Sequence, residues 1–197
     1  MRKIMILVSL LAFSHIIKAQ EERYTVLLSA GQSNLLKQDN DNSHDYANFY
    51  TGTFAFKTGI EYKLTDNNKT LYPTAGISVS LKGAVNNEAG SVPSNSWPER
   101  LFTTDIYTNI NYSFEPWLIF SIGLQSSFPM LHYNYKEENN KLHFAYLDIC
   151  GRVSIKVQRY SLNAEYCLGA TRVMYLPWTD LIYYNERMFT IGLGYSF

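Results

Sequence analysis

The last nine residues, Phe189-Thr-Ile-Gly-Leu-Gly-Tyr-Ser-Phe197, alternate strictly between large apolar and small side chains. This period of two is the period of a β-strand, whose successive side chains point to opposite faces. The large face carries Phe189, Ile191, Leu193, Tyr195 and Phe197, and the other face carries only Thr, Gly and Ser. A strand of a soluble protein would place charge on its outer face. The small, uncharged second face instead indicates a strand that separates lipid from a crowded interior.

The composition is lean in charge and rich in aromatic residues. The 197 residues are 46% hydrophobic, 15% aromatic and 17% charged, with a formal net charge of zero. This length fits one domain. We expect no nucleic-acid partner, because such binding needs a basic surface.

The N-terminus has the pattern of a secretory signal peptide. Arg2 and Lys3 precede an apolar run at 4–17, and the small residue Ala19 follows it. A membrane anchor is the alternative, but this run is shorter than the roughly twenty residues that a spanning helix needs. We therefore predict a cleaved signal peptide over residues 1–20.

Eight segments of strand character fill the remaining domain, residues 21–197. They are 23–36, 48–64, 71–84, 100–114, 117–128, 142–157, 160–175 and 187–197. Three connections are tight, and four are longer and polar; the longer ones are 37–47, 85–99, 129–141 and 176–186. Short turns at one end and long loops at the other are typical of outer-membrane barrels. A soluble eight-stranded barrel such as a lipocalin would also alternate in this way.

Each predicted strand has one face without charge and one face of small polar residues. The polar faces also collect charged residues, four of each sign: Lys57, Glu61, Lys82, Asp105, Asp148, Arg152, Lys156 and Glu165. Small polar residues fit the narrow lumen of an eight-stranded barrel. We therefore predict an all-β fold, an eight-stranded antiparallel up-and-down transmembrane β-barrel, with these charges as a polar network in its lumen. Balanced charges favour a plug of salt bridges, and a narrow gated channel is the alternative.

A two-residue turn at 158–159 would fix the register of the strands on either side. It sets Arg152 opposite Glu165, a favourable cross-strand pair. It also sets Cys150 opposite Cys167, at a pair where the two chains approach closely. In an oxidising periplasm the two cysteines could form a disulfide, and two free buried thiols are the alternative because bridges between adjacent strands are often strained.

The closing pattern Phe-x-Ile-x-Leu-x-Tyr-x-Phe at 189–197 resembles the C-terminal strand of bacterial outer-membrane β-barrels. In that class the pattern is the signal that the barrel-assembly machinery reads. The whole chain resembles the small outer-membrane barrels of the OmpA/OmpX-like and PorT-like type. The resemblance implies an outer-membrane location and contact with outer-membrane lipid and with the assembly machinery. It also implies envelope protein partners, with roles from envelope integrity to adhesion or support of a secretion apparatus.

We find no convincing catalytic or metal-binding motif. Barrel enzymes of this size need a His with a Ser, and the candidates His44, His132 and His143 lie in predicted loops or at the outer rim. Asp39-x-Asp41-x-Ser43-x-Asp45 spaces oxygen ligands like a calcium loop but lacks the Gly and Glu that complete an EF-hand. We predict no cofactor, no metal and no enzymatic activity. A non-enzymatic barrel that acts through its loops is the first hypothesis; an enzyme on lipid A or peptides and a narrow channel are the alternatives.

Overall fold

A computed structural model of the chain describes residues 23–39, 50–65, 70–86, 97–133, 141–142, 145–171, 174–175 and 182–197. Ten strands lie within these residues. They are β1 Tyr24–Asp39, β2 Tyr50–Lys63, β3 Leu71–Asn86, β4 Trp97–Glu115, β5 Leu118–Tyr133, β6 Lys141–Leu142, β7 Tyr146–Val157, β8 Tyr160–Gly169, β9 Met174–Tyr175 and β10 Ile182–Ser196. The predicted signal peptide, the calcium-like spacing around Asp41, and the residues His44 and His143 lie outside the described residues.

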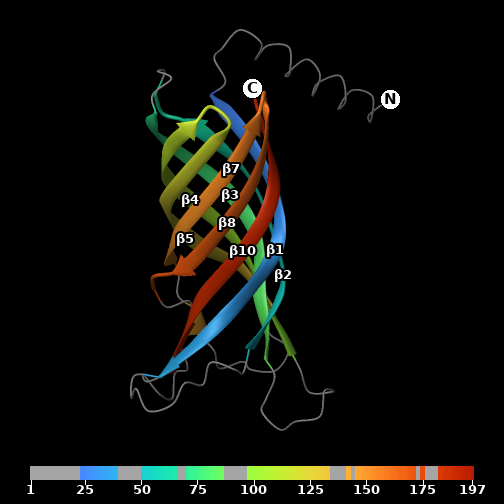
Figure 1. The fold of residues 1–197 in the computed structure, drawn as a ribbon. Coiled ribbons are helices and arrows are strands. Elements are labelled where there is room, and N and C mark those ends of the chain that lie inside the picture. The colour runs from blue at the N-terminus through green and yellow to red at the C-terminus, as the bar shows by residue number, and fades with distance from the viewer. Residues whose placement is uncertain are drawn as a thin grey trace, which may run out of the picture.

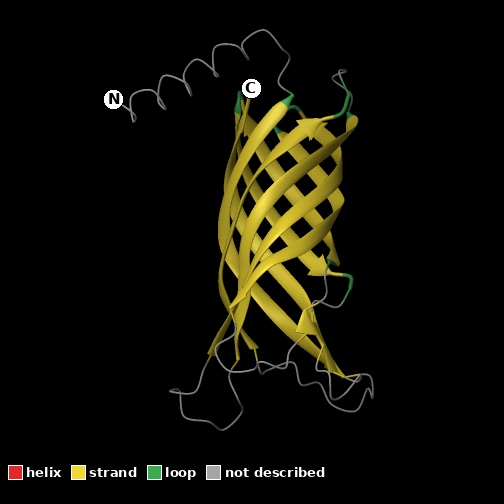
Figure 2. Cartoon of the chain, turned by 180° about the vertical axis from the view of Figure 1, so that it is seen from behind, coloured by secondary structure: helices red, strands yellow, loops and turns green. Residues whose placement is uncertain are grey.

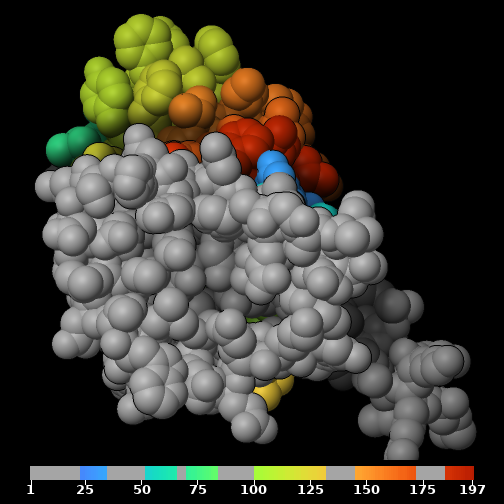
Figure 3. Space-filling view, turned by 90° about the horizontal axis from the view of Figure 1, so that it is seen from below, coloured from blue at the N-terminus to red at the C-terminus, as the bar shows by residue number. Residues whose placement is uncertain are grey.

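Eight of the strands close into a barrel (Figure 1, Figure 2). The order around the wall is β1, β2, β3, β4, β5, β7, β8 and β10, and β10 pairs with β1 to complete the circle. Seen from one end, the side of the wall in view runs from yellow-green through orange to red and blue, which is the same order (Figure 3). All neighbouring strands are antiparallel. The predicted eight-stranded up-and-down barrel is therefore confirmed.

The start of β1, the end of β10 and the turns β4–β5 and β7–β8 lie at one end of the barrel, called here the short-turn end (Figure 1). Gln158 in the β7–β8 turn has a φ of 56°. Two-residue hairpin loops need this left-handed conformation. No helix among the described residues is both long and apolar enough to span a bilayer.

Several strand ends differ from the prediction; β5, for example, runs to Tyr133 rather than to residue 128. The segment expected to run to residue 175 stops at Gly169, because the main-chain N–H groups of Ala170 and Thr171 both donate to the carbonyl of Leu147 at the start of β7. The Leu147 N–H in turn donates to the Thr171 hydroxyl at 2.7 Å. Residues 174–175 form the separate strand β9, which pairs with β10. In addition, β7 begins at 146 rather than 142, and β10 begins at 182 rather than 187.

The two faces of the wall differ as the alternation predicts. In β10 the side chains of Ile191 and Leu193 are 52% and 64% exposed on the outside, whereas Thr190 is 1% exposed on the inside. The burial pattern of β7 alternates in the same way. A continuous apolar belt around a barrel is stable in lipid, where every backbone group must be paired internally.

The inner face is less uniformly small than the sequence suggested. Leu101, Tyr107, Tyr146 and Met188 point inward and are almost fully buried. The Tyr107 ring occupies the space where a Cβ atom of Gly76 would lie. Glycine at position 76 therefore lets a large ring fit into the narrow lumen.

Aromatic rings cover the wall at the short-turn end. Tyr24 lies 5.0 Å from Tyr62, and Tyr160 lies 5.2 Å from Tyr195, measured between ring centroids. Phe197 joins the two pairs, at 6.0 Å from Tyr195 and 6.3 Å from Tyr24. Such a row matches the aromatic girdle at a membrane surface.

Candidate functional site

The first group of charges in the lumen is balanced. Lys57 on β2 lies 2.5 Å from Glu165 on β8, and it also donates to the Gln125 side chain on β5 at 2.8 Å. Arg152 on β7 donates to Glu61 on β2 at 2.6 Å. All four charged side chains are buried. Because each carboxylate has a cation within contact, this central cluster is neutral and crosses the barrel from wall to wall.

The second group surrounds Lys82 on β3 and carries an excess of carboxylates. The Nζ atom of Lys82 lies 3.3 Å from Glu186, 3.6 Å from Asp105 and 3.7 Å from Asp148. It also donates to the Ser127 hydroxyl at 3.1 Å. Asp105 accepts hydrogen bonds from the hydroxyl groups of its neighbours, Ser80 among them. One ammonium group thus holds three carboxylates together.

The Lys82 cluster closes the lumen at its level. Lys82, Asp105, Gln125 and Asp148 are each at most 1% exposed, and they come from four consecutive strands of the wall. Glu186 completes the cluster from β10. Water does not reach these side chains, so this layer of the described barrel contains no open passage.

The eight charged residues predicted to face the lumen separate into three places. Lys57, Glu61, Arg152 and Glu165 form the central cluster, whereas Lys82, Asp105 and Asp148 belong to the cluster around Lys82. Lys156 is half-buried and lines a cavity near the short-turn end.

The expected register of β7 and β8 is present, with Arg152 opposite Glu165. However, the closest carboxylate to Arg152 is Glu61 across the lumen, since Arg152 lies 3.9 Å from Glu165. Glu165 instead makes its short contact with Lys57. The shortest ion pairs of Arg152 and Glu165 therefore run across the lumen to β2 and not across the β7–β8 ladder. The register of one hairpin does not predict such contacts.

Sequence reasoning missed Glu186, because the last strand was expected to begin at residue 187 and the structure begins it at Ile182. The signal was present, since Glu186 continues the inward series of Met188 and Thr190 at a spacing of two. The alternation of the fourth strand placed Tyr107 on the lumen face, as the structure has it, whereas the inward ring of Tyr146 was missed. Both residues share a face with predicted lumen residues of their own strands, Asp105 and Asp148.

Cys150 and Cys167 are joined by a disulfide, with their Cα atoms 4.1 Å apart. They are opposite one another in the β7–β8 ladder, as the turn predicted. Of the two alternatives left open by the sequence, the structure contains the bridge, and it ties the β7–β8 hairpin together inside the lumen.

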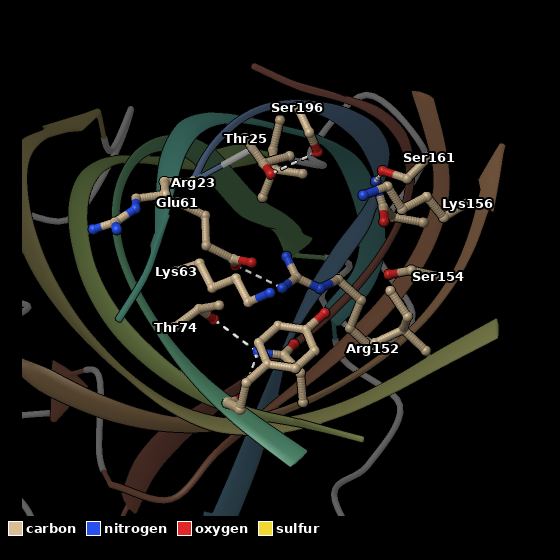
Figure 4. A pocket seen from close by; sticks show the side chains of 15 residues that line it. Arg23, Thr25, Glu61, Lys63, Thr74, Arg152, Ser154, Lys156, Ser161 and Ser196 are labelled. Carbon is tan, nitrogen blue, oxygen red and sulfur yellow. Dashed lines mark hydrogen bonds and ion pairs between the residues drawn. The ribbon is translucent and has the colours of Figure 1, made fainter. Parts of the chain in front are cut away.

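A cavity of about 100 Å³ lies between the central cluster and the short-turn end (Figure 4). Its lining includes the cationic residues Arg23, Lys63, Arg152 and Lys156 and the carboxylate Glu61. Hydroxyl and amide side chains make up much of the rest. A wider opening of about 540 Å³ shares Lys63 and Lys156 with this cavity.

Chemistry beyond salt bridges has little support in the described part of the chain. No three His, Cys, Asp or Glu residues within it are placed to hold a metal ion. His132 lies near the end of β5, but its side chain, like His44 and His143, is outside what the structure describes. The histidine hypothesis therefore stays a prediction.

The sequence matches no protein-family model and no curated protein. Among solved structures, neisserial surface protein A (NspA) matches with a TM-score of 0.52 at 12% identity, covering 88% of this chain and 97% of that one. Ail, the attachment invasion locus protein of Yersinia pestis, matches with a TM-score of 0.42 at 11% identity, covering 90% of this chain and 100% of that one. The outer membrane protein AlkL matches with a TM-score of 0.46 at 10% identity, covering 91% of this chain and 93% of that one. These structures do not test the PorT-like resemblance. The chain is a closed, eight-stranded antiparallel β-barrel, and its likeness to NspA concerns this fold alone.

Proposed function

We propose that this protein is a non-enzymatic outer-membrane barrel that supports contacts of its long connections with envelope partners. The observation that carries the proposal is the sealed layer around Lys82, whose ion-paired side chains are at most 3% exposed and, together with Ser127, link five strands of the wall. A barrel filled in this way is a rigid scaffold rather than a conduit. Function in such a scaffold falls to the segments between strand ends.

The four longer connections are the candidate contact segments. They include residues 40–49, 87–96, 134–140 and 176–181, and they join strand ends opposite the short-turn end. Short turns face the periplasm in barrels of this class, so these connections would face outward. The sequence Leu176-Pro-Trp-Thr-Asp-Leu-Ile-Tyr-Tyr184 is apolar enough to contact a partner protein.

Export and assembly belong to the same proposal. The signal peptide at 1–20 would direct the chain to the periplasm. The closing residues would then present the assembly signal, Phe189, Ile191, Leu193, Tyr195 and Phe197, to the barrel-assembly machinery. The apolar outer face supports outer-membrane lipid as the final environment.

Photo-crosslinking in native membranes tests the role of the connections. A crosslinker placed at residue 179 in the intact protein should capture a defined partner, and replacement of 176–181 by a short Gly-Ser turn should abolish that partner's capture from other sites. Lys63→Gln, at the opposite end, is the matched control and should retain it. Capture of the same partner after each of the four connections has been shortened would contradict the proposal.

Two further measurements address the alternatives. The purified barrel should show no steady conductance in a planar bilayer, because the Lys82 layer excludes water. It should also leave lipid A and peptide substrates unchanged. Conductance would establish the channel, and turnover would establish the enzyme.

A further inference from the structure

The cavity near the short-turn end has the composition of an anion site. Its lining carries four cationic side chains, Arg23, Lys63, Arg152 and Lys156, and one carboxylate, Glu61, which is paired with Arg152. In Figure 4, Lys63 and Arg152 extend into the middle of the ring of lining residues from opposite sides. A cleft with low-dielectric walls and one dominant sign of charge concentrates ions of the opposite sign.

Arg152 forms a fixed cationic floor for this cavity. Its Nη2 atom donates to Glu61 at 2.6 Å, and its Nη1 atom lies 3.9 Å from Glu165. Its Nε atom has no hydrogen-bond partner among the described residues. The guanidinium group is therefore held in place by carboxylates of two strands, and guanidinium groups suit planar recognition of oxyanions.

Lys63 is the second positioned cation. Its Nζ atom lies 4.7 Å from the centre of the Tyr72 ring, and Tyr72 itself lines the cavity. This contact between a cation and an aromatic face favours a side chain directed toward the lumen rather than into bulk solvent.

Neutral donors surround these cations. The Thr25 and Ser196 hydroxyl groups are 3.0 Å apart, and the Asn111 amide donates to the Thr74 hydroxyl at 3.0 Å. On β8, which pairs with β10, the Asn163 amide donates to the Ser161 hydroxyl at 3.1 Å. Hydroxyl and amide groups can redirect a proton toward an entering oxygen atom, so the site can satisfy several oxygen atoms at once.

We propose that this cavity binds a phosphate-class oxyanion that enters from the short-turn end. Its volume of about 100 Å³ exceeds the space of one water molecule several-fold and fits a small tetrahedral ion. The adjoining opening of about 540 Å³, which shares Lys63, Tyr72 and Lys156 with the cavity, provides the entry route. The phosphate group is either free in solution or carried by a lipid headgroup.

Titration of the purified full-length protein with inorganic phosphate tests the site. In zwitterionic detergent at constant ionic strength, calorimetry should show saturable binding of one phosphate per chain, which chloride does not reproduce. Lys63→Gln and Lys156→Gln should each weaken binding about tenfold, since each removes a charge-assisted contact. Arg100→Gln, a cation on β4 that donates to the Phe54 carbonyl and does not line the cavity, is the matched control and should bind like wild type.

The source of the phosphate is separated in nanodiscs. Equal phosphate binding in phosphatidylcholine and phosphatidylglycerol nanodiscs identifies the occupant as a free ion. Phosphate binding that is lost only in phosphatidylglycerol nanodiscs identifies a lipid headgroup as the occupant, because the headgroup then fills the site. Heat-modified mobility on gels confirms that each variant is folded. The proposal is overturned by non-saturable heats, or by Lys63→Gln and Lys156→Gln affinities equal to that of Arg100→Gln.

Discussion

Lys82→Met should lower the free energy of unfolding of the barrel by about 3–5 kcal/mol, because it leaves buried carboxylates without their shared cation. The Nζ atom contacts Glu186, Asp105 and Asp148 at 3.3, 3.6 and 3.7 Å. Two unit charges about 4 Å apart interact by about 4 kcal/mol at an effective dielectric constant of about 20. Methionine fills a similar volume, so the loss reports charge rather than a cavity.

Glu186→Gln breaks one of the same contacts and should behave differently. Lys82 keeps Asp105 and Asp148 as partners, and the cluster loses one negative charge from a group with three carboxylates and one ammonium. The relief of repulsion offsets the lost attraction, so the expected change is within about 1 kcal/mol. The double variant should recover part of the stability that Lys82→Met loses.

Unfolding in phosphatidylcholine vesicles with increasing guanidinium, followed by tryptophan fluorescence, gives these free energies. Gel mobility with and without heating verifies that each variant starts folded. The reasoning is refuted if Lys82→Met stays within about 1 kcal/mol of wild type, or if Glu186→Gln is as destabilising as Lys82→Met.

Three other predictions concern the disulfide, the glycines and the N-terminus. The unreduced protein denatured in SDS should take up no alkylating reagent, and mass spectrometry should find two added groups after reduction, at Cys150 and Cys167; two added groups before reduction would exclude the bridge. Gly123→Ala should destabilise the barrel by about 1–3 kcal/mol, since the new Cβ would clash with the Asn109 side chain and the Thr108 carbonyl. Gly151→Ala, with no atom within 4 Å of the new Cβ, should leave the free energy of unfolding unchanged or slightly higher. Equal losses of stability in the Gly123 and Gly151 variants would contradict this account of the packing. N-terminal sequencing of the protein from membranes should begin at Gln20 or Glu21, and a sequence starting at Met1 would indicate an uncleaved anchor.

The wall of the barrel could be predicted from the sequence because it depends on local rules. Strict alternation identifies which side chains of a strand share a face, as for Thr190 and Leu193. A two-residue turn fixes the register of its hairpin, which placed Cys150 opposite Cys167.

The contacts across the lumen could not be predicted in the same way. Arg152 meets Glu61, and Lys82 meets Glu186, because strands far apart in the sequence face one another once the barrel closes. The stagger of all eight strands sets these distances, and no single hairpin contains that information. The end of β8 could not be predicted either. Hydrogen bonds to Leu147 end the strand, and no polar or glycine-rich run marks that point in the sequence.

Spin labels along β5 test the central claim that the apolar face of the wall lies in lipid. Both cysteines are bridged, so single cysteines can be introduced at Phe120, Ser121, Ile122, Leu124 and Gln125 and labelled in vesicles. Collision rates with dissolved oxygen should be high at positions 120, 122 and 124 and low at 121 and 125, because the first set is exposed outside and the second faces the lumen. Rates without this alternation, or with its phase reversed, would contradict a lipid-embedded barrel.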